Sequence, residues 1–185
     1  MRSIMFACCT VFAGMAGAQV PTVASSAPVN ASIVLDVPGG FYHSFLINTV
    51  DKPIAETVEL RIEKRNAHPQ WVPGSTLCVT AASSSHEACL RVSASGLSGD
   101  TLSVARMMFD KRDKRGPLSH DPVAGTFKMG DRIRIAVRAG PDSVEFKVGD
   151  GAWMMQALPF TPEAISLICS SAVCTMRLGE ALNAP

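Results

Sequence analysis

Apolar and polar positions alternate with a period of two along most of the chain, which is the pattern of β-strands with one buried face. Val58, Leu60 and Ile62 alternate with charged residues, and the segment 131–138 repeats the pattern with arginines on its polar face. The alternation predicts strands over residues 32–37, 41–50, 56–64, 76–81, 88–94, 101–108, 125–129, 131–138, 143–148, 152–158, 164–169 and 173–178.

Turn-forming residues separate these segments, for example Pro38-Gly39-Gly40, Gly140-Pro141-Asp142 and Gly149-Asp150-Gly151. Many short strands with such punctuation predict an all-β fold, an antiparallel β-sandwich of the jelly-roll or immunoglobulin-like kind. No internal repeat and no helix is expected. Residues 31–185 are predicted to form one domain of ordinary size, because a chain of this length can bury a core of its own.

The N-terminus has the pattern of an export signal. Arg2 precedes an apolar run over residues 4–14, and Ala16-Gly17-Ala18 provides the small residues at a cleavage site. Residues 1–18 are therefore predicted to be a signal peptide, and residues 19–30 a flexible leader. The apolar run is too short to span a bilayer, and no later segment qualifies, so we expect a periplasmic or secreted protein without a membrane span.

Charge gives no reason to expect a nucleic acid as partner. Removing Arg2 from the 17 basic residues balances the 16 acidic ones. The most highly charged stretch, residues 110–115, alternates in sign, which favours a solvated loop tip over a binding patch.

Four cysteines remain once Cys8 and Cys9 leave with the signal. Strand alternation places Cys78 and Cys89 on an outward face, and Cys169 and Cys174 on inward faces. A disulfide needs facing side chains at short range, so the geometry predicts the local pairs Cys78–Cys89 and Cys169–Cys174, each closing a hairpin. A zinc site is disfavoured, because the spacings do not fit paired CxxC motifs and an oxidising compartment removes thiolates.

One family resemblance rests on the same residues. Trp71 shortly before Cys-x10-Cys, then strands, then Leu158-Pro159-Phe160 leading into Cys-x4-Cys near the C-terminus, resembles the invasion-associated locus B family of bacterial envelope proteins. The resemblance implies a small exported β-sandwich linked to host-cell contact or envelope integrity, with no catalytic residues to carry over.

A second resemblance concerns the later strands. Phe127-x-x-Gly130-Asp131, followed by the strand 133–137 and by 144–148 with its Gly-Asp-Gly turn, is similar to galectin-type and laminin-G-type jelly rolls, which often bind sugars. The galectin sugar motif itself is absent, although the segment 65–71 holds similar residue types in another order. The candidate ligand contacts are therefore Arg65, His68, Trp71 and Trp153.

The sequence predicts no catalytic residue, no metal site and no cofactor. The histidines have no metal-ligand spacing, no Gly-x-Ser-x-Gly motif occurs, and nothing selects a pair among the carboxylates. We therefore expect a non-enzymatic envelope or secreted interaction protein associated with invasion or host contact, its partner an envelope or host-surface protein or a glycan. The alternatives are a lectin-like carbohydrate-binding module and a secreted hydrolase on a jelly-roll scaffold.

Overall fold

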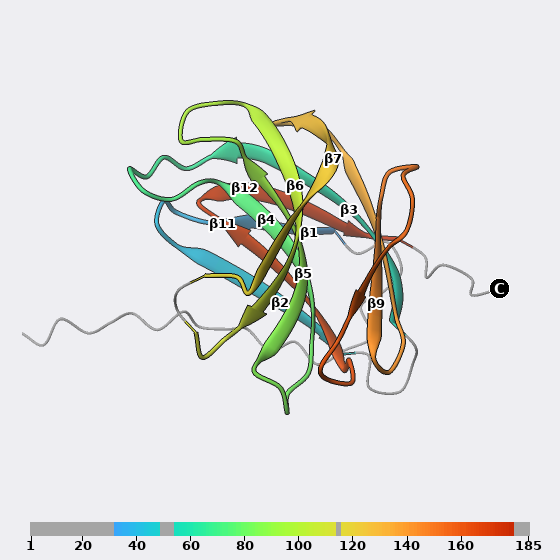
Figure 1. Ribbon diagram of the computed structural model, residues 1–185. Helices are drawn as coiled ribbons and strands as arrows, with labels where there is room; N and C mark the ends of the chain where they lie inside the picture. The colour runs from blue at the N-terminus through green and yellow to red at the C-terminus, as the bar shows by residue number, and fades with distance from the viewer. Residues whose placement is uncertain (1–31, 49–53, 114–115, 180–185) are drawn as a thin grey trace, which may run out of the picture.

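A computed structural model describes residues 32–48, 54–113 and 116–179. Two six-stranded antiparallel sheets pack face to face in a β-sandwich (Figure 1). Sheet A has the order β1-β12-β3-β8-β9-β10, and sheet B has the order β2-β11-β4-β5-β6-β7. The all-β sandwich predicted from the sequence is confirmed, and its order is that of a jelly roll.

The strand bounds follow the predicted alternation closely. In sheet A they are β1 (Ser32–Asp36), β12 (Ala172–Leu178), β3 (Ile54–Arg65), β8 (Ile133–Ala139), β9 (Ser143–Val148) and β10 (Met154–Ala157). In sheet B they are β2 (Tyr42–Asn48), β11 (Ala164–Ser170), β4 (Gly74–Thr80), β5 (His86–Ala94), β6 (Thr101–Asp110) and β7 (Ser119–Lys128).

One apolar core fills the space between the sheets. The inward residues of both sheets, such as Ile62 and Phe146 from sheet A and Leu90 and Ile165 from sheet B, are fully buried. Each alternates along its strand with residues of the outer face, as the period of two requires. The outer face of sheet B is consequently built from the residues that the core does not use.

The largest departure from the predicted strands is β7, which begins at Ser119 where the sequence pattern predicts Gly125. Pro122 lies inside this strand. Proline usually ends a strand because it has no N–H to donate, but β7 is the edge of sheet B and has a partner on one side only. Because an edge strand can contain a proline, the sequence pattern does not predict the first half of β7.

Both predicted disulfides are present, and the outward and inward orientations are confirmed. Cys78 and Cys89 lie directly opposite each other on β4 and β5 and belong to a small cluster outside the core. Cys169 and Cys174 are buried in the core itself.

The prediction that each disulfide closes a hairpin is wrong for the second pair. Cys169 lies on β11 in sheet B and Cys174 on β12 in sheet A, so this bridge joins the two sheets across a corner of the chain. The buried Ser171 turns the corner with a left-handed φ of 48°. Its hydroxyl accepts a hydrogen bond from the Gly40 N–H at 3.0 Å, which holds the corner against the β1–β2 turn.

The expected signal peptide and leader, residues 1–30, lie outside the described residues. Within the described ranges, no helix has the length and apolarity that crossing a membrane requires.

Candidate functional site

The loops at one end of the sandwich enclose an open pocket of about 650 Å³, which we call the end pocket. It lies where β4 ends and β5 begins, beside the loops that lead into β11 and out of β6. A volume in this range suits a small ligand. Its lining consists of Ala82, Ser83, Ser84, Ser85, His86, Arg112, Pro159, Phe160, Thr161 and Glu163.

Hydrogen bonds between these loops fix the shape of the end pocket. The Ala82 N–H donates to Oε2 of Glu163 at 2.7 Å, and the Glu163 N–H donates to the Thr80 carbonyl at 2.9 Å. The His86 N–H donates to the Ser84 hydroxyl at 3.0 Å. The serine-rich loop therefore adopts a defined conformation beside the segment 159–163, although its sequence has no periodic pattern.

Arg112 is held at the mouth of the pocket by Asp110. The Arg112 N–H and guanidinium both donate to the Asp110 carboxylate, at 3.0 and 3.3 Å. These hydrogen bonds, together with one from Ser85, lower the pKa of Asp110 to about 2. The carboxylate therefore stays charged, and anchors Arg112, across the physiological pH range.

The lining offers the kinds of contact that recognise a polyhydroxylated molecule. Ser83 and Thr161 are exposed hydroxyl residues, and Arg112 adds a cation. Phe160 is half-buried and is the aromatic ring of the lining, on which the apolar face of a sugar could stack. Glu163 is the carboxylate of the lining, and the Ser84 hydroxyl bonds the backbone of His86 instead of its imidazole.

Three of the four predicted ligand contacts, Arg65, His68 and Trp71, lie together at the opposite end of the sandwich. Trp71 is 40% exposed and meets His68 edge to face, with ring centroids 6.4 Å apart. Arg65 donates to the carbonyls of Leu97 and Gly99, so its guanidinium serves to tie two loops together. These residues precede β4, whereas the end pocket follows it.

The fourth predicted contact, Trp153, lies apart from the other three. The guanidinium of Arg138 covers its ring at 4.3 Å, and Arg138 also pairs with Glu145. The indole is half-buried next to β10, and this cation–π contact occupies one of its faces.

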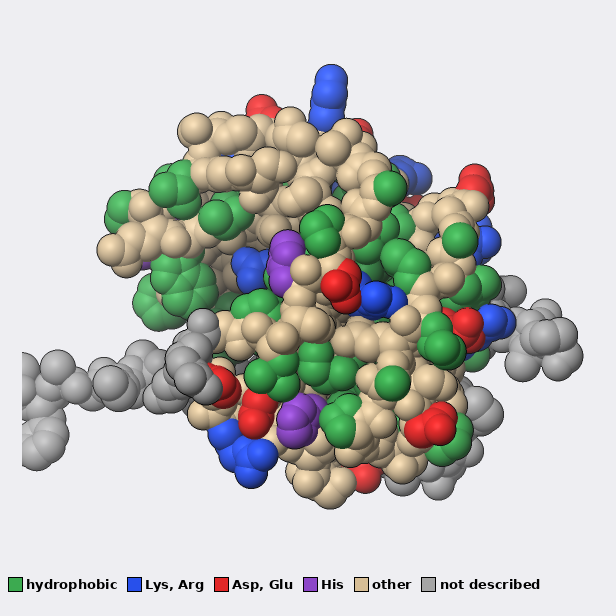
Figure 2. Space-filling model, viewed as in Figure 1, with side chains coloured by type: hydrophobic (Ala, Val, Ile, Leu, Met, Phe, Trp, Pro, Cys, Tyr) green, Lys and Arg blue, Asp and Glu red, His purple; other side chains and the backbone are tan. Residues whose placement is uncertain are grey.

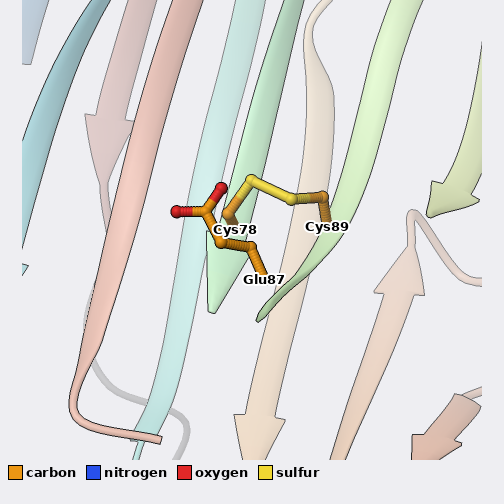
Figure 3. Close-up of side chains that lie close together, drawn as sticks. All are labelled: Cys78, Glu87 and Cys89. Atoms are coloured by element: carbon orange, nitrogen blue, oxygen red, sulfur yellow. A yellow bond between two sulfur atoms is a disulfide. The ribbon is translucent and has the colours of Figure 1, made fainter. Parts of the chain in front are cut away.

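Figure 3 shows a second cluster, in which the Glu87 carboxylate lies near the sulfurs of Cys78 and Cys89. The three ligand-type atoms lie within 4.8 Å of one another. Both sulfurs are bonded in the disulfide, so neither is a thiolate that could bind a metal. Glu87 is paired instead with Lys111, at 3.4 Å.

Sequence reasoning missed the end pocket. Its residues come from three loops that are far apart in the chain and that read individually as turns. The serine run 83–85 beside a His is the one signal that could have drawn attention to it.

Comparison with known proteins gives similar solved structures but no family. No family model matches the chain, and no curated protein is similar to it, so the invasion-associated resemblance stays a prediction. Among solved structures, the chain is similar to carbohydrate-binding module CBM66 from Bacillus subtilis (10% identity, TM-score 0.42, covering 80% of this chain and 83% of that one). It is also similar to the Caenorhabditis elegans galectin LEC-6 (12% identity, TM-score 0.46, 80% and 96%) and to the Crh5 transglycosylase in complex with NAG (15% identity, TM-score 0.48, 86% and 74%).

These identities and TM-scores are too low to indicate what the chain binds or catalyses, and the sandwich fold rests on its own two sheets. The prediction that the protein is not an enzyme is withdrawn, because the similar solved structures include a transglycosylase as well as a binding module and a galectin.

Proposed function

We propose that the protein binds glycans and that the end pocket holds a sugar unit of the ligand. The observation that carries the proposal is the lining of this pocket of about 650 Å³, which includes hydroxyl groups, a guanidinium, a carboxylate and a phenyl ring. Sugars present alternating hydroxyl groups and an apolar ring face, and this mixture of contacts matches both.

Two disulfides support an oxidising compartment, extracellular or periplasmic, where glycans are abundant. We infer that the ligand is an envelope or host-surface glycan. The role in host contact implied by the invasion-associated resemblance stays a prediction, and attachment of a deletion strain to host cells would test it.

The proposal is tested by a glycan array followed by calorimetry on the glycans that bind. The Arg112→Gln variant should weaken binding roughly tenfold, the effect of losing one charged hydrogen bond. Arg112 is exposed, so the variant should fold normally. Arg134→Gln is the matched control, because Arg134 is an exposed arginine on the outer face of sheet A.

An array without binding, or equal affinity of the Arg112→Gln variant and the wild type, would contradict the proposal. Incubation of each bound glycan with the protein, followed by measurement of new reducing ends, separates binding from hydrolysis or transglycosylation.

A further inference from the structure

A second feature of sheet B lies outside the end pocket, on the strand β5. Leu90 and Val92 are fully buried in the core, so Arg91 between them points to the outer face of the sheet. In sheet B, β5 has three strands on one side, β4, β11 and β2, and two on the other, β6 and β7, which places Arg91 near the middle of this face. Five positions of β5 separate it from His86 of the end pocket, about 17 Å at ~3.4 Å per residue.

Arg91 is a partly buried charge that has no partner among the residues the structure describes. Among the described residues, none forms a hydrogen bond or an ion pair with its guanidinium. Burial also lowers its pKa below that of an ordinary arginine. By contrast, Arg61, Arg65, Arg106, Arg112, Arg132 and Arg138 each have a carboxylate within ion-pair distance.

An unpaired charge of this kind destabilises a folded protein, because the charge loses water and gains nothing in return. Proteins retain such groups at sites where a ligand supplies the missing partner.

The surroundings of Arg91 combine hydroxyl groups with a small apolar cluster and a rigid support. Thr76 lies directly opposite on β4 and Ala105 directly opposite on β6, and Ser93 and Ser103 form the next pair on β5 and β6. The Cys78–Cys89 bridge lies two residues before Arg91 on the same face and locks β4 to β5 beneath it. Figure 2 shows one face of the molecule, on which acidic, basic and histidine side chains are interspersed with hydrophobic ones.

We propose that Arg91 is an anion-binding site for the carboxylate or sulfate of an acidic sugar, with the hydroxyls of Thr76, Ser93 and Ser103 contacting the sugar ring. A guanidinium offers paired N–H donors that match the two oxygens of a carboxylate. This inference rests on the proposed function, which is glycan binding. It adds that the bound glycan is acidic.

The test is an NMR titration of ¹⁵N-labelled full-length protein, following the Arg91 side-chain Nε–H signal and the amides of β4 and β5. The probes are glucuronate, glucose 6-sulfate, glucose and inorganic sulfate. We expect saturable shifts around Arg91 with one or both acidic sugars, and affinity at least roughly tenfold weaker for glucose. The Arg91→Gln variant should lose these shifts, whereas the exposed-arginine control Arg134→Gln should keep them.

Three results would overturn the inference: acidic and neutral sugars binding alike, acidic sugars binding equally to Arg91→Gln, or inorganic sulfate binding as tightly as the acidic sugars, which shows an anion site without sugar recognition. The Arg112→Gln variant reports on the end pocket separately. If Arg112→Gln loses glycan binding but acidic sugars cause no shifts at Arg91 in the wild type, this inference alone is contradicted. If acidic sugars cause shifts at Arg91 but Arg112→Gln binds glycans as the wild type does, the proposed function alone is contradicted.

A second variant separates a ligand site from a merely structural arginine. Arg91→Met keeps the length of the side chain and removes the unpaired charge, so it should raise Tm of the ligand-free protein by about 2–4 °C while abolishing binding of acidic sugars. A Tm below that of the wild type would show that Arg91 supports the fold, and would contradict the inference.

Discussion

Charged residues of the end pocket are held by hydrogen-bond partners that the sequence pattern does not predict. Arg112 is aimed by Asp110, and Glu163 is engaged by the backbone of Ala82. Arg91 differs from both because only the alternation of side chains along β5 sets the direction in which it points. In the end pocket and on the outer face of sheet B alike, the chemistry of a charged residue therefore depends on whether another described residue pairs with it.

Asp110, which holds Arg112, should contribute to the pH dependence of Tm at acid pH. The pKa of Asp110 is lowered to about 2 from its usual value of 3.8, so its contribution to stability is present above about pH 4 and is lost as the pH falls toward 2. Asp110→Asn should flatten the fall of Tm over this range. Arg112→Gln should flatten it less, because it removes the side-chain hydrogen bond and the charge of Arg112 but keeps the backbone N–H, which is the largest cause of the lowered pKa. A wild-type slope in both variants would contradict this assignment.

Gly39 is required where two loops meet. A Cβ at this position would lie well inside contact distance of the Ala67 carbonyl, which is backbone and cannot move aside. Gly39→Ala should destabilise the protein by about 1–3 kcal/mol in chemical denaturation. Gly96→Ala is the matched control, since no atom lies within 4 Å of its Cβ. Equal stability of the two variants would show that the loops relax.

At the scale of elements, the two disulfides have different tasks. The chain-entropy model gives a loss of about 3 kcal/mol for removing Cys78–Cys89 and about 2 kcal/mol for Cys169–Cys174, from their sequence separations of 11 and 5. The second pair is also buried in the core, so its removal leaves a cavity that adds to the loss.

Binding should respond to the first disulfide more than to the second. Replacing both Cys78 and Cys89 with Ala frees β4 from β5 beside Arg91 and should weaken binding of acidic sugars, whereas replacing Cys169 and Cys174 should leave the affinity of the folded protein near that of the wild type. Denaturation midpoints and calorimetry on the two double variants check both statements. The opposite order of affinities would contradict the role of the outer bridge.

Strand alternation explains why most elements could be predicted and some could not. The period of two is a local property, so it gives the strands, the outward face of Cys78 and Cys89, and the inward face of Cys169 and Cys174. It does not say in which sheet a strand lies, so it predicts a hairpin at Ser171, where the chain instead passes from one sheet to the other. It also gives Arg91 as an ordinary outward residue, because its burial and its lack of a partner arise only from the assembled sheet.

At the scale of the whole molecule, three of the four candidate residues from the sequence and the pocket from the structure lie at opposite ends of the sandwich. Trp71 precedes β4 and Ala82 follows it, so the length of that strand, about 24 Å, separates them. A single sugar unit cannot contact both, and the two ends can be tested independently.

Trp71→Ala decides which end binds the glycan. If the end pocket is the site, the variant should keep the wild-type affinity in calorimetry, while Phe160→Ala should lose roughly tenfold or more because it removes the ring on which a sugar stacks. Phe160 also packs against the core, so thermal unfolding must show that the variant is folded, and Phe160→Trp should restore binding by restoring a ring. The reverse pattern, with loss for Trp71→Ala and none for Phe160→Ala, would move the site to the end that Trp71 shares with His68, where the exposed indole would be the stacking surface.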